Sequence, residues 1–454
     1  MADQQAARAP ATYPLPATDA ARGASLAWRR LVCAGLSACL ALTMSVPVAG
    51  ALPNSQHHSV DDAAIEAARA ATFVLLGEAT HGTSEFYSER AKFTAHLLDD
   101  GRAGAVVVEA DASEVERVNR YVRGIGQDGS AAEALSSFRR FPRWMWRNQE
   151  FAQFVEQLRA ANLRRAEANR VGVYGMDVYD LYGALDRVRA YVRPRLRAAS
   201  AAADAVARCL APYRRSTEAY GIASRKPARS CATQAANLLD AVTKAPPALG
   251  VAEREDRFAA LQAAAAVVAG EAYFHSAFAG AYSWNVRERS MATAVKRVAE
   301  HASGQGGPPR VVVWAHNSHV ARAASTTMVE RGETSIADLL RQEGRDRVFT
   351  MGLLTHFGTF MAAPAWDKPG QVFRLLPAAR NSVEGLLRRS GQARSVVMLG
   401  SAAPPALGEW RPQRAIGVVF DAATPDAVYS RTQLATEFDA IMFLDQTRAV
   451  SPLP

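Results

Sequence analysis

The sequence predicts an α/β protein with a largely parallel central sheet, flanking helices and a large helical insertion between the third and fourth strands. Short runs rich in Val, Ile, Leu and Phe recur along the chain, and most of them are separated by helix-like stretches. That pattern is typical of strands that are buried on both faces of a parallel sheet. Between residues 180 and 305 such runs are missing, and Ala, Arg, Leu and Glu recur with helical periodicity instead.

Short apolar runs bounded by Gly, polar or helix-like residues are the predicted strands. They cover residues 72–76, 105–108, 171–174, 310–314, 348–354, 395–399, 415–420 and 439–444. The chain has 454 residues, of which 49% are hydrophobic, so it can bury a sizeable core. We expect one catalytic domain over residues 52–454, with residues 180–305 as its helical insertion.

The first 51 residues predict an N-terminal extension that ends in a secretory signal. Residues 31–49 carry no charge and follow two arginines, and the small residues 49–51 resemble a signal-peptidase site. An uncleaved membrane anchor is the alternative, because the apolar run approaches the ~20 residues that span a bilayer. Residues 36–39 also resemble a lipoprotein box, although the apolar run continues beyond it. We expect a periplasmic or secreted protein without a membrane contact after cleavage.

The cysteines and the net charge indicate which compartment and which partners the protein is expected to have. Cleavage of the signal would leave Cys209 and Cys231, and in an oxidising compartment such a pair is expected to form a disulfide across a helical hairpin. Neither cysteine has a second Cys or a His at metal-ligand spacing. The net charge of +9 comes mostly from arginines scattered over helix-like stretches rather than from a basic stripe. A nucleic-acid partner is therefore not expected.

Four predicted strands are followed by polar residues that can do acid–base chemistry. The carboxyl ends of parallel strands meet at one edge of a sheet, where α/β proteins place their sites. The residues brought to that edge are Glu78, His81, Glu109, Asp177, His316 and His319. Singly, an acidic residue after a strand can be a helix cap, and a lone histidine is more often structural. The chain has only 9 histidines, however, and three of them fall at strand ends beside carboxylates.

Familiar nucleophile and phosphate-binding motifs are absent from the sequence. It contains no Gly-x-Ser-x-Gly elbow, no His-Glu-x-x-His zinc helix and no Gly-x-x-x-x-Gly-Lys loop. These absences argue against a serine hydrolase, a zinc metalloprotease of that type and a P-loop enzyme. What remains is a His/Glu site that activates water, or a His/carboxylate site that holds a metal.

Further short motifs surround the strand-end residues. They are GEATHG at 77–82, EF at 85–86, VE at 108–109, YGMD at 174–177, RExxMA at 287–292, AHNxH at 315–319, FDA at 438–440 and LD at 444–445. In this order and spacing they resemble the erythromycin esterase family, over about Thr72 to Asp445. The resemblance implies an α/β core with a helical insertion over a deep cleft. It also implies an enzyme that opens the lactone ring of macrolide antibiotics without a metal.

The resemblance assigns roles to residues by matching position. The expected catalytic residues are His81 as the general base, Glu78 and Glu109 as its acidic companions, Arg90 and Arg287 as cleft arginines, and His316. The expected substrate-binding residues are His319, Asp177 and Asn317. For Arg287 the ordinary alternative is a surface ion pair with Glu288 or Glu271, which would contribute little.

We therefore predict an exported, metal-independent hydrolase of a lactone or bulky ester. A neutral imidazole can take a proton from water near neutral pH, and a carboxylate partner fixes its tautomer. The expected ligand is a small-molecule ester or lactone, no cofactor is expected, and antibiotic resistance is the role that the resemblance implies. Two alternatives keep the same residues: a hydrolase that holds a divalent metal in the His/Glu cluster, and a protein that binds haem or another ligand through the histidines.

Overall fold

The computed structural model describes residues 57–98, 101, 103–248, 250–280, 283–303, 310–342, 348–400 and 403–454. The predicted signal segment, residues 1–51, lies outside the described residues. Among the helices of the described ranges, none is long and apolar enough to cross a membrane.

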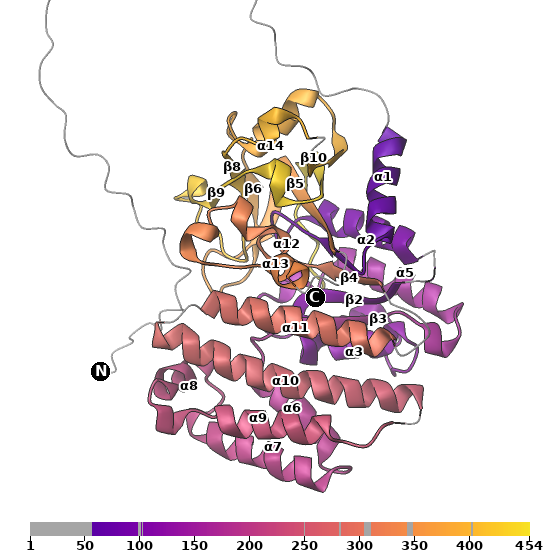
Figure 1. Ribbon diagram of the computed structural model, residues 1–454, viewed down its shortest axis with the longest axis vertical. Helices are drawn as coiled ribbons and strands as arrows, with labels where there is room; N and C mark the ends of the chain where they lie inside the picture. The colour runs from indigo at the N-terminus through magenta and orange to yellow at the C-terminus, as the bar shows by residue number, and fades with distance from the viewer. Residues whose placement is uncertain are drawn as a thin grey trace, which may run out of the picture. The chain divides into compact units, whose positions relative to one another are not determined.

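An eight-stranded sheet runs in the order β3-β2-β4-β1-β5-β10-β7, with β6 paired to β5 (Figure 1). Neighbours from β3 to β10 are parallel, whereas β7 and β6 are antiparallel to their partners. Strands β8 and β9 form a separate antiparallel pair. The strands are β1 Phe73–Leu76, β2 Ala103–Asp111, β3 Gly172–Asp177, β4 Arg310–Trp314, β5 Val348–Ala362, β6 Gln371–Leu375, β7 Arg394–Met398, β8 Arg411–Arg414, β9 Tyr429–Thr432 and β10 Ala440–Thr447. The predicted, largely parallel sheet is confirmed.

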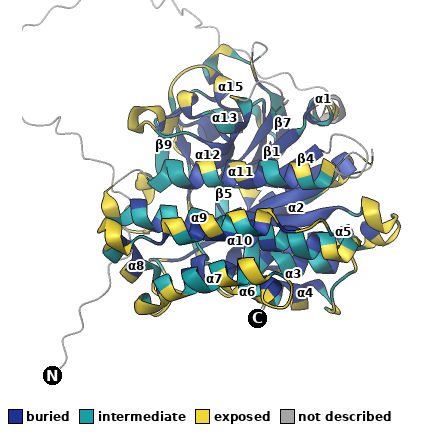
Figure 2. Cartoon of the chain, turned by 60° about the horizontal axis from the view of Figure 1, so that its bottom comes forward, coloured by how far each residue is buried: buried dark blue, intermediate teal, exposed yellow. Residues whose placement is uncertain are grey.

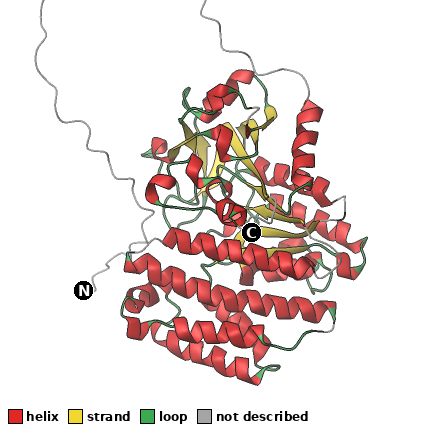
Figure 3. Ribbon diagram, in the orientation of Figure 1, coloured by secondary structure: helices red, strands yellow, loops and turns green. Residues whose placement is uncertain are grey.

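The central strands are apolar because the protein covers both of their faces. Strand β1 lies between β4 and β5, so that Phe73 pairs with Val311 on one side and with Val348 on the other. Every residue of β1 and β4 is buried. Helices lie on both sides of the strands (Figure 3), and this arrangement places the carboxyl ends of β1 to β4 at one edge.

Helices α6 to α11 occupy the chain between β3 and β4, which confirms the predicted insertion. The helices are α1 His57–Arg69, α2 Ser84–Leu98, α3 Ala112–Val122, α4 Ala131–Ala134, α5 Gln149–Leu163, α6 Leu181–Val192, α7 Arg197–Leu210, α8 Thr217–Ser224, α9 Ala232–Thr243, α10 Val251–Ala279, α11 Ser283–Ser303, α12 Asn317–Val320, α13 Ile336–Arg341, α14 Val383–Leu387 and α15 Leu434–Glu437. The insertion has an apolar core of its own, which includes Val188, Leu238 and Val267. Its outer helices α7 and α8 expose many residues, whereas the strands are buried (Figure 2).

The predicted strand at 415–420 is wrong. The segment makes only isolated bridges, from Ile416 to Thr80 and from Val419 to Ala363. It therefore changes partners along its length and cannot form a ladder. Its side chains are apolar because Ile416 and Phe420 belong to a small buried cluster. Strands β6, β8 and β9 were not expected from the sequence, since polar residues interrupt each of them and leave no continuous apolar run.

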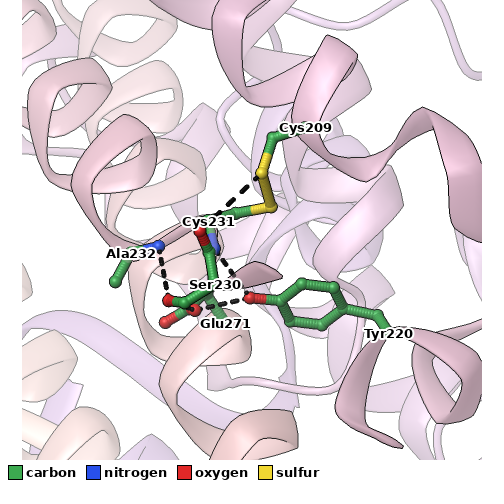
Figure 4. The surroundings of a disulfide bond; sticks show 6 residues. All are labelled: Cys209, Tyr220, Ser230, Cys231, Ala232 and Glu271. Carbon is green, nitrogen blue, oxygen red and sulfur yellow. Dashed lines mark hydrogen bonds between the residues drawn. A yellow bond between two sulfur atoms is a disulfide. The ribbon is translucent and has the colours of Figure 1, made fainter. Parts of the chain in front are cut away.

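The expected disulfide between Cys209 and Cys231 is confirmed, with a Cα–Cα distance of 5.9 Å (Figure 4). It joins the end of α7 to the start of α9. Beside it, the hydroxyl of Ser230 donates a hydrogen bond to Glu271 over 2.8 Å, and the hydroxyl of Tyr220 accepts the backbone N–H of Cys231. The disulfide and these bonds connect four helices of the insertion, α7, α8, α9 and α10.

Candidate active site

The turn at residues 77–82, between β1 and α2, is held closely by two other segments. A Cβ atom at Gly82 would lie 2.0 Å from the carbonyl oxygen of Met361, so this approach requires glycine. The Gly82 carbonyl accepts the backbone N–H groups of Met361 and Val450 at 2.9 and 3.0 Å. The turn therefore presents its side chains from a fixed backbone.

Glu78 and His81 form a hydrogen-bonded pair on this turn. Nδ1 of His81 lies 3.0 Å from Oε1 of Glu78, which is wholly buried. A carboxylate at Nδ1 fixes the tautomer with the proton on that nitrogen and the lone pair on Nε2. Nε2 of His81 has no hydrogen bond to any described residue. The pair therefore offers a basic nitrogen whose orientation is set by a carboxylate.

Arg90 of α2 holds the other oxygen of Glu78. Its Nη2 donates to Oε2 over 2.7 Å, and the guanidinium lies between the rings of Tyr87 and Trp314 at 4.7 and 4.8 Å from their centroids. Arg90 is only 1% exposed. It was expected in the cleft, and the structure places it behind Glu78, where it positions the carboxylate.

A second cluster centres on Arg287 of α11. Its Nη2 donates to Oε1 of Glu109 and to Oδ2 of Asp177, both at 2.7 Å, and its Nε donates to Oδ1 of Asp177 over 2.9 Å. The guanidinium also lies over the ring of Tyr179, 5.0 Å from its centroid. Because all three charged side chains are buried, the alternative of a surface ion pair for Arg287 does not hold.

His319 is protonated by the carboxylates at its two ring nitrogens. Nδ1 donates to Glu288 over 2.6 Å, and Nε2 lies 3.1 Å from Glu109. Burial alone would lower the pKa of His319, but Glu109 and Glu288 raise it to about 9. Nη1 of Arg287 also lies 3.0 Å from Nε2 of His319. When the imidazole is protonated, both nitrogens of that contact are hydrogen-bond donors, so they cannot bond to each other. Oε1 of Glu109 lies within hydrogen-bond distance of both His319 and Arg287 and keeps the two side chains together.

Burial would likewise raise the pKa of Glu109, but the charges of His319 and Arg287 hold that pKa well below its ordinary value. The second oxygen of Glu109 accepts the backbone N–H of His316 over 2.8 Å. Glu109 is therefore an anion that connects the two clusters.

His316 is neutral, unlike its neighbour three residues along the chain. Burial above all, and then His81, lower its pKa to about 3. Its Nδ1 accepts the backbone N–H of Ser318 at 3.3 Å and caps α12. The proton of the neutral ring therefore sits on Nε2, which is buried and has no hydrogen-bond partner among the described residues. The rings of His81 and His316 are 4.9 Å apart.

Asn317 has no free polar atom for a substrate. Its Nδ2 donates to the carbonyl of Leu353 over 3.1 Å, and its backbone N–H donates to the carbonyl of Glu78 over 2.8 Å. A Cβ atom at Gly77 would lie 2.0 Å from its Oδ1. These bonds give Asn317 a structural role between β1, α12 and β5, and its expected contact with substrate stays a prediction.

The remaining expected residues come together as one chain of contacts from Glu78 to Asp177. Sequence reasoning missed two aromatic side chains beside them, Tyr179 and Trp284, and gave no role to Glu288. Trp284 stacks on His319 at 4.9 Å between centroids. Glu288 is wholly buried, and its position directly after Arg287 in a shared motif was the signal that could have identified it.

The donor set bears on metal binding. No group of three or more His, Cys, Asp or Glu side chains in the described ranges is arranged to hold a metal ion. Both ring nitrogens of His319 already lie at carboxylate oxygens, and a protonated imidazole has no lone pair for a metal.

A family model identifies the family of this chain, and three solved structures share its fold. The family model described as erythromycin esterase matches residues 104–447. A solved succinoglycan biosynthesis protein superimposes with a TM-score of 0.68 at 17% identity, covering 90% of this chain and 95% of that chain. A solved Bacillus cereus protein superimposes with a TM-score of 0.67 at 15% identity, covering 86% of this chain and 92% of that chain. A mutant erythromycin esterase in an open conformation superimposes with a TM-score of 0.55 at 14% identity, covering 85% of this chain and 92% of that chain. At these identities the structures support the fold alone.

Proposed function

The chain belongs to the erythromycin esterase family, and from the geometry of its site we propose that it hydrolyses a lactone or bulky ester with His81 as the general base. Membership supports a hydrolase of that type. The observation that carries the proposal is the Glu78–His81 pair, in which Arg90 and Glu78 fix the ring and Nε2 has no hydrogen bond to a described residue. A base held in this way can take a proton from a water molecule as that water attacks an ester carbonyl.

The attack places negative charge on the carbonyl oxygen, and the site has a suitable donor for it. Nε2–H of His316 is buried, unpartnered and next to His81. A neutral imidazole that donates one hydrogen bond stabilises an oxyanion without competing for the proton on the base. Beside it, His319 and Arg287 hold Glu109, whose second oxygen accepts the backbone N–H of His316 and so keeps that residue in place. Proton transfer from His81 to the leaving alkoxide then completes hydrolysis.

The proposal is metal-independent, because the base and the oxyanion donor both come from side chains. The occupied nitrogens of His319 support it against the divalent-metal alternative. We also propose an exported location. It is supported by the disulfide in the insertion, since disulfides persist in oxidising compartments, and by the predicted signal segment.

The test is a mass-spectrometric screen of macrolide lactones and simple esters for a gain of one water. The wild-type protein should hydrolyse at least one class, and His81→Ala should abolish the activity while its circular dichroism stays unchanged. His96→Ala, at an exposed position of α2, is the matched control and should keep full activity. Wild-type turnover in His81→Ala would overturn the assignment of the base, and a loss of folding would favour a structural histidine.

A further inference from the structure

A cavity outside the candidate active site is lined on its polar side by positive charge. It has a volume of about 510 Å³, within the range of small-molecule sites. The residues lining it are His356, Pro377, Ala378, Arg380, Gly385, Arg388 and Arg389. No acidic side chain belongs to this set in the described part of the chain, and none of its residues belongs to the His81 site.

The three arginines come from the two ends of α14. Arg380 precedes the helix, and Arg388 and Arg389 follow it. Arg388 is partly neutralised by Asp445, with Nε 2.7 Å from Oδ1, and Arg389 donates only to the carbonyl of Arg380 over 3.3 Å. The guanidinium of Arg380 has no bond to any described residue. Two of the three positive charges therefore have no anionic partner.

The wall opposite the arginines is fixed by backbone and side-chain bonds. The carbonyl of His356 accepts the backbone N–H of Ala378 at 3.1 Å and Nη1 of Arg414 at 3.2 Å. Nδ1 of His356 is buried without a partner. Burial above all lowers the pKa of His356, so its ring adds a polar but uncharged group. The wall is thus built before any ligand arrives.

We propose that this cavity binds a small molecule carrying an oxyanion, a phosphate or a carboxylate group. Guanidinium groups match such groups with paired, charge-assisted hydrogen bonds. Arg380 and Arg389 hold the oxyanion, Arg388 adds charge, and Pro377 and Ala378 supply an apolar surface for the rest of the ligand. This proposal does not depend on the hydrolase activity, because it uses none of the residues of the His81 site.

The test is calorimetric titration of the full chain with inorganic pyrophosphate and with citrate at constant ionic strength. We expect saturable binding of at least one probe; a response to pyrophosphate alone assigns the phosphate class, and a response to citrate alone the carboxylate class. Arg380→Gln should weaken binding about tenfold, the size of one charge-assisted hydrogen bond. Arg389→Gln should act similarly.

Arg208→Gln, an exposed arginine of α7, removes the same charge elsewhere and is the matched control. It should leave the dissociation constant unchanged. Absence of saturable binding by both probes would overturn the proposal. An equal loss in Arg208→Gln would reduce the effect to net charge, and unchanged binding in Arg380→Gln and Arg389→Gln would place the anion at another site; either result overturns it as well.

Discussion

His316 and His319 lie on one turn, yet their surroundings give them opposite protonation states. His319 sits between two carboxylates, whereas neither ring nitrogen of His316 lies at a carboxylate of the described residues; its ring lies beside Ser318 and His81. One is a fixed cation, and the other is a neutral donor. This difference gives the two residues separate roles: protonated His319 holds Glu109, and the neutral N–H of His316 is available to an oxyanion.

Arg287 is the residue whose removal tests the charged cluster. Arg287→Ala should lower kcat by about 10²-fold, because Glu109, which accepts the backbone N–H of His316, would lose a group that holds its other oxygen and the site would shift. It should also lower stability by ~3–5 kcal/mol, because Glu109 and Asp177 would remain buried without their partner. Arg287→Lys should restore only part of the activity, since lysine lacks the planar fork that binds two carboxylates.

The control for this variant lies two residues further along the same helix. Arg289 is exposed, so Arg289→Ala should leave kcat and the melting temperature close to wild type. Steady-state kinetics and thermal unfolding measure both quantities. A kcat for Arg287→Ala within a few-fold of wild type would remove Arg287 from the catalytic account.

The positions of the strand-end residues could be predicted from the sequence, but their protonation states could not. Glu78, His81, Glu109 and Asp177 each follow an apolar run. The charge on His319, however, depends on Glu288, which α11 brings from 31 residues earlier in the chain. Helical periodicity does not specify which carboxylate faces which imidazole across two elements.

At the scale of elements, the sequence predicts which segments are buried but not which segments pair with one another, and this explains the wrong strand prediction. β1 and β4 were predicted within one residue, because strands buried on both faces are apolar throughout. The segment at 415–420 is equally apolar, but it crosses from one element to another and bonds singly to each. Apolar character therefore predicts that a segment is buried. To form a strand, the segment must also pair along its length with one neighbouring strand, which apolar character does not predict.

Helix α15 contributes a buried carboxyl group that makes stability depend on pH. Burial above all raises the pKa of Glu437 to about 8 from an ordinary value of 4.5, and the Thr432 hydroxyl of β9 donates to it over 2.6 Å. The folded state holds this proton more tightly than the unfolded state does. Stability should therefore fall as pH rises from 4.5 to 8, on the order of 1.4 kcal/mol per pKa unit.

Glu437→Gln keeps an oxygen for Thr432 and removes the titration. Its melting temperature should vary less with pH across this window than that of the wild type, and at pH 8 the variant should be the more stable protein. Glu330→Gln, at an exposed position, should follow the wild-type curve. Parallel curves for Glu437→Gln and wild type would show that Glu437 does not hold the proton.

At the scale of the whole molecule, the site depends on both the sheet and the helical insertion. Strands β1, β2 and β3 deliver Glu78, Glu109 and Asp177, and the arginine that joins the last two comes from α11. The insertion is therefore part of the candidate site. Its internal disulfide stabilises helices that lie further from the sheet.

Chelation separates the proposed mechanism from the metal-dependent alternative. Exhaustive treatment with EDTA should leave kcat/KM unchanged, since no step of the mechanism uses a cation. Elemental analysis of the treated protein checks that chelation was complete. Activity that is lost on chelation and restored by Zn²⁺ or Mn²⁺ would favour a metal held by the His/Glu cluster.

The central claim is that His81 activates water for direct attack on the ester, and a single turnover in ¹⁸O-labelled water tests it most directly. With enzyme in excess over a substrate found in the screen, mass spectrometry should find one heavy oxygen in the acid formed in the first turnover and none in the intact protein. An unlabelled first product, together with heavy oxygen in a carboxylate of the protein, would show covalent attack by a residue such as Glu109 or Asp177 and would contradict the account.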